Sequence, residues 1–163
     1  MRRGTQIAVI GKGAPDDDLG RVAEEVGRAI AESGAVLVCG GMGGVMEAAS
    51  RGAHEAGGDV IGIVPTDDTA SANPHVTHAV ATGIGHARNL AVVASADAVI
   101  AIGGEWGTLA EIGFARRLGR TVVALRSWTV SGSGEMEGGP GIEAVADPRA
   151  AVDLALEVAG ERR

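Results

Sequence analysis

The chain has 163 residues, of which 45% are hydrophobic but only 2% aromatic, so its core has to be built from Val, Ile, Leu and Ala. This length suits one domain with a substantial core, and we expect residues 1–163 to form a single domain. The formal net charge of −7 argues against binding to nucleic acid or to an anionic membrane surface.

Strands and helices are predicted to alternate along the chain. Short apolar runs predict strands at residues 6–10, 35–39, 59–64, 76–80, 98–102, 121–125 and 142–145. Apolar side chains at helical spacing predict helices at about residues 16–33, 45–57, 85–95, 109–118 and 147–158. Residues 66–74 are polar and predict a surface loop, and residues 127–141 are rich in Gly and Ser and predict a flexible loop.

These repeated strand–helix units predict an α/β fold, a Rossmann-like, doubly wound and mostly parallel sheet with helices on both faces. Ligands bind such sheets at the carboxyl ends of the strands, where the strand order reverses. Glycine-rich turns follow three predicted strands, at residues 11–13, 40–44 and 103–107. Their backbone amides and the helix N-termini behind them suit a phosphate, although glycines that serve only chain geometry remain the alternative.

The third turn is the most informative of these segments. It reads Gly-Gly-Glu-Trp-Gly-Thr over residues 103–108, where Thr108 offers a hydroxyl and a helix cap, and Glu111 lies one turn further along the helix. None of the turns has the dinucleotide-binding glycine fingerprint or a Walker A pattern. This argues against NAD-dependent oxidoreductases and ATPases.

Residues 39–47 (CGGMGGVME), 86–89 (HARN) and 103–111 (GGEWGTLAE) together resemble a Rossmann-like superfamily once named "possible lysine decarboxylase". That superfamily includes the Lonely Guy phosphoribohydrolases and the molybdenum cofactor carrier proteins. The resemblance covers roughly residues 6–158, and the segments 87–89 and 103–108 are more similar to the carrier branch. A lysine decarboxylase is not expected, because the chain lacks a separate domain for pyridoxal phosphate.

The turns and the resemblance together give the expected ligand-binding residues: Gly11, Gly13, Gly40, Gly41, Gly43, Gly44, Arg88, Asn89, Gly103, Gly104, Gly107 and Thr108. As a carrier, the chain would hold the phosphate of molybdopterin, the molybdenum cofactor, and would break no bond. As a phosphoribohydrolase, it would cleave the N-glycosidic bond of a nucleoside 5′-monophosphate. Arg88 and Glu111 stand at the positions of that family's catalytic pair, and Glu111 would activate water or stabilise the ribosyl cation. Neither function requires a cofactor.

Several features leave alternatives open. Arg88 and Glu111 also suit an ordinary ion pair between two helices, and Glu105 replaces a glycine of the hydrolase motif, where its carboxylate would repel a phosphate. Trp106 suits stacking on a ring or packing against another subunit. The resemblance implies a homodimer or homotetramer.

Cellular context follows from what the sequence lacks. The single cysteine, Cys39, excludes an intramolecular disulfide, and no metal site is expected. No apolar run reaches transmembrane length and no signal-peptide region is recognised, so we expect a cytoplasmic protein.

Overall fold

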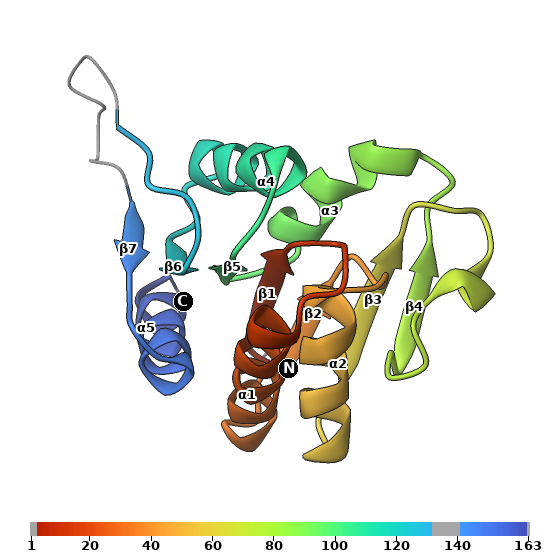
Figure 1. Cartoon of the computed structure of the whole chain (residues 1–163), viewed down its shortest axis with the longest axis horizontal. Coiled ribbons are helices and arrows are strands. Elements are labelled where there is room, and N and C mark those ends of the chain that lie inside the picture. Colours follow the sequence, from red (N-terminus) through yellow and green to blue (C-terminus); the bar gives the residue numbers. More distant parts are fainter. Residues whose placement is uncertain (1–2, 132–140, 163) are drawn as a thin grey trace.

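A seven-stranded parallel sheet is the centre of the structure (Figure 1), a computed structural model that describes residues 3–131 and 141–162. The strand order is β4-β3-β2-β1-β5-β6-β7, and every neighbouring pair is parallel. The strands are β1 (Gln6–Gly11), β2 (Val36–Cys39), β3 (Val60–Val64), β4 (His78–Ala81), β5 (Ala98–Ile102), β6 (Val122–Leu125) and β7 (Ile142–Ala144). The predicted Rossmann-like α/β fold is therefore confirmed.

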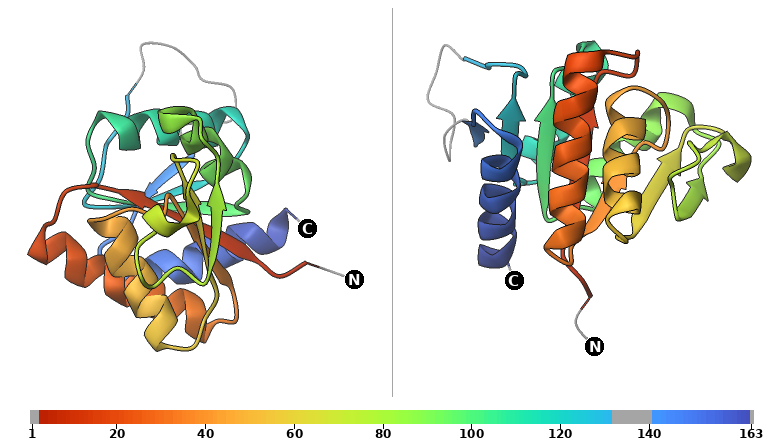
Figure 2. Two further views of the ribbon diagram at one scale, coloured as in Figure 1. Left: turned by 90° about the vertical axis from the view of Figure 1, so that its right-hand side faces the viewer. Right: turned by 60° about the horizontal axis from the view of Figure 1, so that its bottom comes forward.

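Five α-helices cover the two faces of the sheet. They are α1 (Asp17–Glu32), α2 (Val45–Glu55), α3 (Arg88–Ala94), α4 (Trp106–Arg117) and α5 (Pro148–Glu161). Helices α1, α2 and α5 lie on one face, and α3 and α4 lie on the other (Figure 2). Each face has its own core of buried Val, Ile, Leu and Ala side chains, as the low aromatic content requires.

Local details differ from the sequence predictions. The predicted loop at residues 66–74 contains a 3₁₀ turn (Thr69–Ser71), and the predicted helix at 85–95 begins with another (Gly85–Ala87) before α3. Helix α4 starts at Trp106 with Glu105 at its N-cap, so Thr108 lies within the first turn and does not cap the helix. The predicted flexible loop falls partly on residues 132–140, outside the described residues.

No helix in the described part of the chain has the length and apolar character needed to cross a membrane.

Close contact between α1 and α2 depends on two glycines, Gly27 and Gly52. The sequence pattern does not distinguish them from the other glycines of the chain. A Cβ on Gly27 of α1 would overlap the carbonyl oxygen of Ala49, and a Cβ on Gly52 of α2 would overlap that of Glu24. The two backbones therefore touch directly. Beside this contact, Arg51 donates to Glu24 through Nε at 3.0 Å and through Nη2 at 2.8 Å.

Substituting Gly52→Ala should separate α1 from α2 and lower the free energy of unfolding by about 1–3 kcal/mol, the usual cost of overpacking. The matched control is Gly113→Ala in α4, because a Cβ there meets no atom of residues 3–131 and 141–162 within 4 Å. That control should gain about 0.5–1 kcal/mol from the better helix propensity of Ala. Urea unfolding of both variants measures the difference, and an equal effect at the two positions would contradict the direct backbone contact.

Candidate functional site

The strand order reverses between β1 and β5, and a cavity of about 280 Å³ lies at the carboxyl ends of these two strands. In open parallel sheets this is the place where ligands bind. The cavity is lined by Val9, Ile10, Gly11, Lys12, Gly13, Gly40, Met46, His86, Arg88, Asn89, Glu105, Gly107, Thr108 and Glu111.

Arg88 is the buried cation of the cavity, with 7% of its surface exposed. Its Nη2 donates to the carbonyl of Gly40 at 3.3 Å, and its Nη1 donates to the side-chain oxygen of Asn89. Its Nε is buried and has no hydrogen-bond partner among the described residues. Gly40 makes this position possible, because a Cβ there would lie 2.7 Å from Nη2.

Glu111 lies in the second turn of α4 and is 8% exposed. Burial raises the pKa of Glu111 to about 7, and the nearby Arg88 partly opposes this shift. Burial likewise lowers the pKa of Arg88, and Glu111 opposes that change. The hydrogen bonds described for the Arg88 guanidinium go to Asn89 and Gly40, so Glu111 acts on it through charge rather than through a direct hydrogen bond.

The N-terminus of α4 brings backbone amides to the same cavity. Gly103 and Gly104 have φ values of 57° and 120°, which bend the chain from β5 into the helix in a way that other residues rarely adopt. The first helical hydrogen bond runs from the N–H of Leu109 to the carbonyl of Glu105 at 3.1 Å. The amides of Gly107 and Thr108 precede it, and together with Arg88 they suit an anion such as a phosphate.

The structure separates the predicted binding residues into groups. Those lining the Arg88 cavity are Gly11, Gly13, Gly40, Arg88, Asn89, Gly107 and Thr108, together with the predicted catalytic Glu111. Gly103 and Gly104 line a neighbouring hollow, and Gly44 lines a third between α1 and α2. Gly41 packs against β3, where a Cβ would lie 2.7 Å from Val64 Cγ1, and a Cβ on Gly43 would lie 3.5 Å from the carbonyl oxygen of Gly13.

Gly44, at the end of the second glycine turn, supports the first turn. The N–H of Val45, at the start of α2, donates to the carbonyl of Lys12 at 2.9 Å. A Cβ on Gly44 would overlap that same carbonyl oxygen, so the close approach requires glycine at this position. This contact fixes the loop after β1 against α2.

Sequence reasoning did not assign Lys12 to the site, although its ammonium group belongs to the first glycine loop. Lys12 lines the cavity, and its Nζ forms an ion pair with Asp16 at 3.2 Å. Because a lysine between two glycines after a strand places a cation at the sheet edge, the signal was present.

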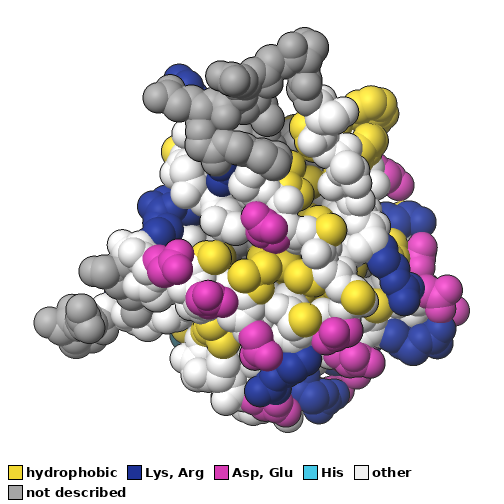
Figure 3. Space-filling model, turned by 90° about the vertical axis from the view of Figure 1, so that its left-hand side faces the viewer, with side chains coloured by type: hydrophobic (Ala, Val, Ile, Leu, Met, Phe, Trp, Pro, Cys, Tyr) yellow, Lys and Arg dark blue, Asp and Glu magenta, His cyan; other side chains and the backbone are white. Residues whose placement is uncertain are grey.

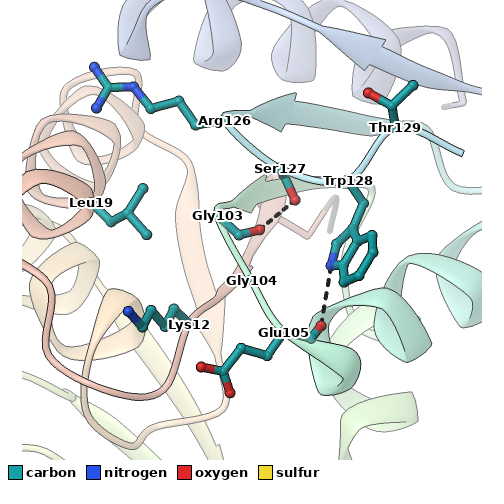
Figure 4. A pocket seen from close by; sticks show the side chains of 9 residues that line it. All are labelled: Lys12, Leu19, Gly103, Gly104, Glu105, Arg126, Ser127, Trp128 and Thr129. Atoms are coloured by element: carbon teal, nitrogen blue, oxygen red, sulfur yellow. Dashed lines mark hydrogen bonds between the residues drawn. The ribbon is translucent and has the colours of Figure 1, made fainter.

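A second hollow of about 520 Å³ adjoins the cavity and shares Lys12 and Glu105 with it (Figure 4). It is lined by Lys12, Leu19, Gly103, Gly104, Glu105, Arg126, Ser127, Trp128 and Thr129. The last four follow β6 and were not predicted as site residues. Two hydrogen bonds hold the middle of this segment against the loop after β5: Ser127 Oγ donates to the carbonyl of Gly103 at 2.6 Å, and Trp128 Nε1 donates to the carbonyl of Glu105 at 3.2 Å.

Comparison with known proteins places this geometry among related chains. The sequence model of the SLOG cluster4 family matches residues 4–152. An uncharacterized protein of Archaeoglobus fulgidus is 46% identical over 121 residues, which are 74% of this chain and 80% of that protein.

Two solved structures extend the likeness over the whole fold. The molybdenum cofactor binding protein of Rippkaea orientalis superposes with a TM-score of 0.86 at 31% identity, covering 97% of this chain and 99% of that one. The molybdenum cofactor carrier protein of Chlamydomonas reinhardtii superposes with a TM-score of 0.82 at 28% identity, covering 97% and 99%. The resemblance inferred from the sequence is thus confirmed.

The raised pKa of Glu111 predicts how stability changes with pH. With a pKa of about 7 in the folded chain and its ordinary 4.5 in the unfolded chain, Glu111 binds more proton in the folded state between these values. The free energy of unfolding should therefore fall as the pH rises from about 4.5 to about 7, by up to about 3 kcal/mol.

Glu111→Gln removes the titrating group, so the free energy of unfolding should no longer fall as the pH rises. The variant should therefore be more stable than the native chain at about pH 8, and the two stabilities should differ much less at about pH 5. The control is Glu25→Gln, at an exposed position of α1. Urea unfolding at both pH values checks the expectation. A native chain that gains stability between them, relative to Glu111→Gln, would contradict the assigned environment.

Proposed function

Since the chain belongs to the SLOG cluster4 family, we propose that the Arg88 cavity binds the phosphate of a small phosphorylated ligand, and that the chain is a carrier of the molybdenum cofactor. The ligand is cargo in this proposal and no bond is broken. The observation that carries the proposal is the buried Nε of Arg88, which has no hydrogen-bond partner in the part of the chain that the structure describes, at a cavity that Gly107 and Thr108 of α4 also line.

A buried guanidinium with an unsatisfied N–H is costly unless an acceptor reaches it. A phosphate supplies such acceptors, and an arginine fork binds it with charge-assisted hydrogen bonds. Asn89 and the α4 amides add neutral donors on the same cavity wall. The donor set therefore fits a phosphate monoester.

The buried position of Glu111 allows this carboxyl group to lie beside a bound phosphate. With a pKa of about 7, raised by burial, a large fraction of its side chain is uncharged near neutral pH. The uncharged form does not repel a phosphate and can donate one hydrogen bond. In the proposed carrier, the protonation of Glu111 sets the net charge beside Arg88.

The likeness to proteins described as binding or carrying the molybdenum cofactor, over 97% of this chain in each case, supports the choice of a pterin cofactor as cargo. We extend that ligand to this chain on the strength of the shared fold and of the donor set in the Arg88 cavity.

A second function, nucleoside 5′-monophosphate phosphoribohydrolase, is favoured by Glu111 alone. A carboxyl group with a pKa of about 7 is suited to general acid–base work near neutral pH. In this alternative Glu111 would activate water or stabilise the ribosyl cation, and Arg88 would bind the substrate.

We also propose that the chain forms a homo-oligomer. Large apolar side chains are exposed on and near α3 and α4: Ile84, Leu90, Trp106, Phe114 and Leu118. The face at the β7 edge likewise has hydrophobic side chains between groups of charged ones (Figure 3). Exposed apolar patches of this kind are typical of contact surfaces.

The site is tested by calorimetric titration of AMP into the native chain, Arg88→Gln and Arg117→Gln. Arg88→Gln should weaken binding about tenfold or more, because a charged hydrogen bond contributes about 1.5–3 kcal/mol. The exposed Arg117 of α4 is the matched control, and its loss should leave the affinity unchanged. Arg88→Gln should still fold, since it removes a poorly satisfied buried charge. Equal binding by all three chains would overturn the site.

The native chain and a further variant, Glu111→Ala, separate the two functions. Pterin that copurifies with the chain, without release of adenine from AMP, supports the carrier. Adenine release that Glu111→Ala abolishes would instead establish the hydrolase.

A further inference from the structure

We propose that the hollow beside the Arg88 cavity holds the ring of the ligand, and that Glu105 selects rings with two adjacent N–H donors, such as guanine and pterins. This inference rests on the proposed function, because it takes the phosphate of the same ligand to lie in the Arg88 cavity. It adds the chemical class of ring and the residue that recognises it.

The two spaces are positioned for one ligand. They share Lys12 and Glu105 in their walls, so a molecule anchored by its phosphate at Arg88 can extend into the hollow. The hollow, at about 520 Å³, lies in the usual size range of small-molecule pockets.

Trp128 gives the hollow an aromatic wall. Its indole N–H donates to the carbonyl of Glu105 at 3.2 Å, which fixes the ring relative to the start of α4. The ring of Trp106 packs against it at a centroid distance of 5.4 Å and a tilt of 37°. A planar heterocycle stacks well on such a surface, and this stacking depends little on which heterocycle it is.

Glu105 supplies the selectivity that stacking lacks. Although Glu105 occupies the N-cap position of α4, its side chain makes no capping hydrogen bond. Figure 4 shows the side chain extending from the chain toward the side of the hollow where Lys12 lies, with Trp128 on the other side. An ionised carboxylate only accepts hydrogen bonds, so it favours a ring edge that presents neighbouring donors.

The ring edges of common ligands differ in this respect. Guanine presents a ring N–H beside its 2-amino group, and a pterin presents the same pair. Hypoxanthine keeps the ring N–H but lacks the amino group, and adenine places an acceptor nitrogen beside its amino group. Glu105 should therefore rank guanine and pterin first, hypoxanthine next and adenine last. Glu105 lines both spaces, so it is the guanidinium of Arg88, together with the α4 amides, that assigns the phosphate to the Arg88 cavity.

Titration with GMP, IMP and AMP tests the ranking, because GMP and IMP differ only in the 2-amino group. Calorimetry gives the affinities. Fluorescence gives a second readout, because Trp128 lines this hollow and packs against Trp106, the other tryptophan of the chain. GMP should bind about tenfold more tightly than IMP, as expected for one hydrogen bond to a charged group, and AMP more weakly still.

Glu105→Gln should bring the GMP-to-IMP affinity ratio close to one without weakening the binding of inorganic phosphate, because the substitution removes a negative charge from the cavity lining. The matched control is Glu157→Gln on α5, an exposed position outside both spaces, which should keep the native ratio. A loss of folding would lower all affinities together, so the ratio reports on recognition alone.

Equal affinities for the three nucleotides in the native chain, still lowered by Arg88→Gln, would overturn the ring selectivity and leave the phosphate site intact. Absence of binding by all three nucleotides and by inorganic phosphate would overturn both proposals.

Discussion

The parallel pairing of β1 with β5 is the constraint on which the site depends. These strands are far apart in the sequence but run in register from Ile7 opposite Ala98 to Gly11 opposite Ile102, so they end together at one edge. From there the chain leaves β1 toward α1 on one face of the sheet and leaves β5 toward α4 on the other (Figure 1). Because the two connections diverge, the strand ends stay uncovered, and the loops after them face a common space.

That shared space holds a buried cation and a buried carboxyl group, and burial works against the charge of both. It lowers the pKa of Arg88 and raises that of Glu111, while each side chain supports the charge of the other. Burial has the larger effect on both pKa values, so removing the two charges from water costs more than their attraction returns, and the pair adds little to stability. Such an arrangement is expected where a ligand completes it, since proteins depart from good packing chemistry mainly at functional sites.

The general fold was predictable because short apolar runs indicate buried parallel strands, and the glycines after them indicate the turns that follow. The contributions of individual glycines were not predictable, since the sequence does not say which backbone approaches which. Gly52 allows α1 and α2 to touch, Gly44 lets α2 meet the loop after β1, and Gly40 makes room for Arg88. Gly40 and Gly44 belong to a turn where glycine also suits a phosphate, and Gly52 lies inside helix α2. The sequence pattern therefore does not show which of these glycines contacts a ligand and which allows two backbones to approach.

The second hollow was beyond sequence reasoning for a related reason. Its aromatic wall comes from the segment after β6, whose Gly- and Ser-rich continuation predicts only a loop. The position of Trp128 is set by the carbonyl of Glu105, and that of Ser127 by the carbonyl of Gly103. Every residue has a backbone carbonyl, so the sequence does not indicate which carbonyl accepts a given side-chain hydrogen bond.

Two side chains of opposite charge line both spaces, whereas Arg88 lines only one of them. Lys12 and Glu105 both line the Arg88 cavity and the neighbouring hollow, but they come from the separate loops after β1 and β5. A ligand with an anionic end and a ring edge rich in donors is favoured in one orientation, with its anion toward Arg88 and its donors toward Glu105. The reversed orientation would set the anion against the carboxylate and the ring donors against Arg88. The strand reversal provides the opening, and in the proposed binding mode Arg88 of α3 and Glu105 of the loop after β5 determine the orientation of the ligand.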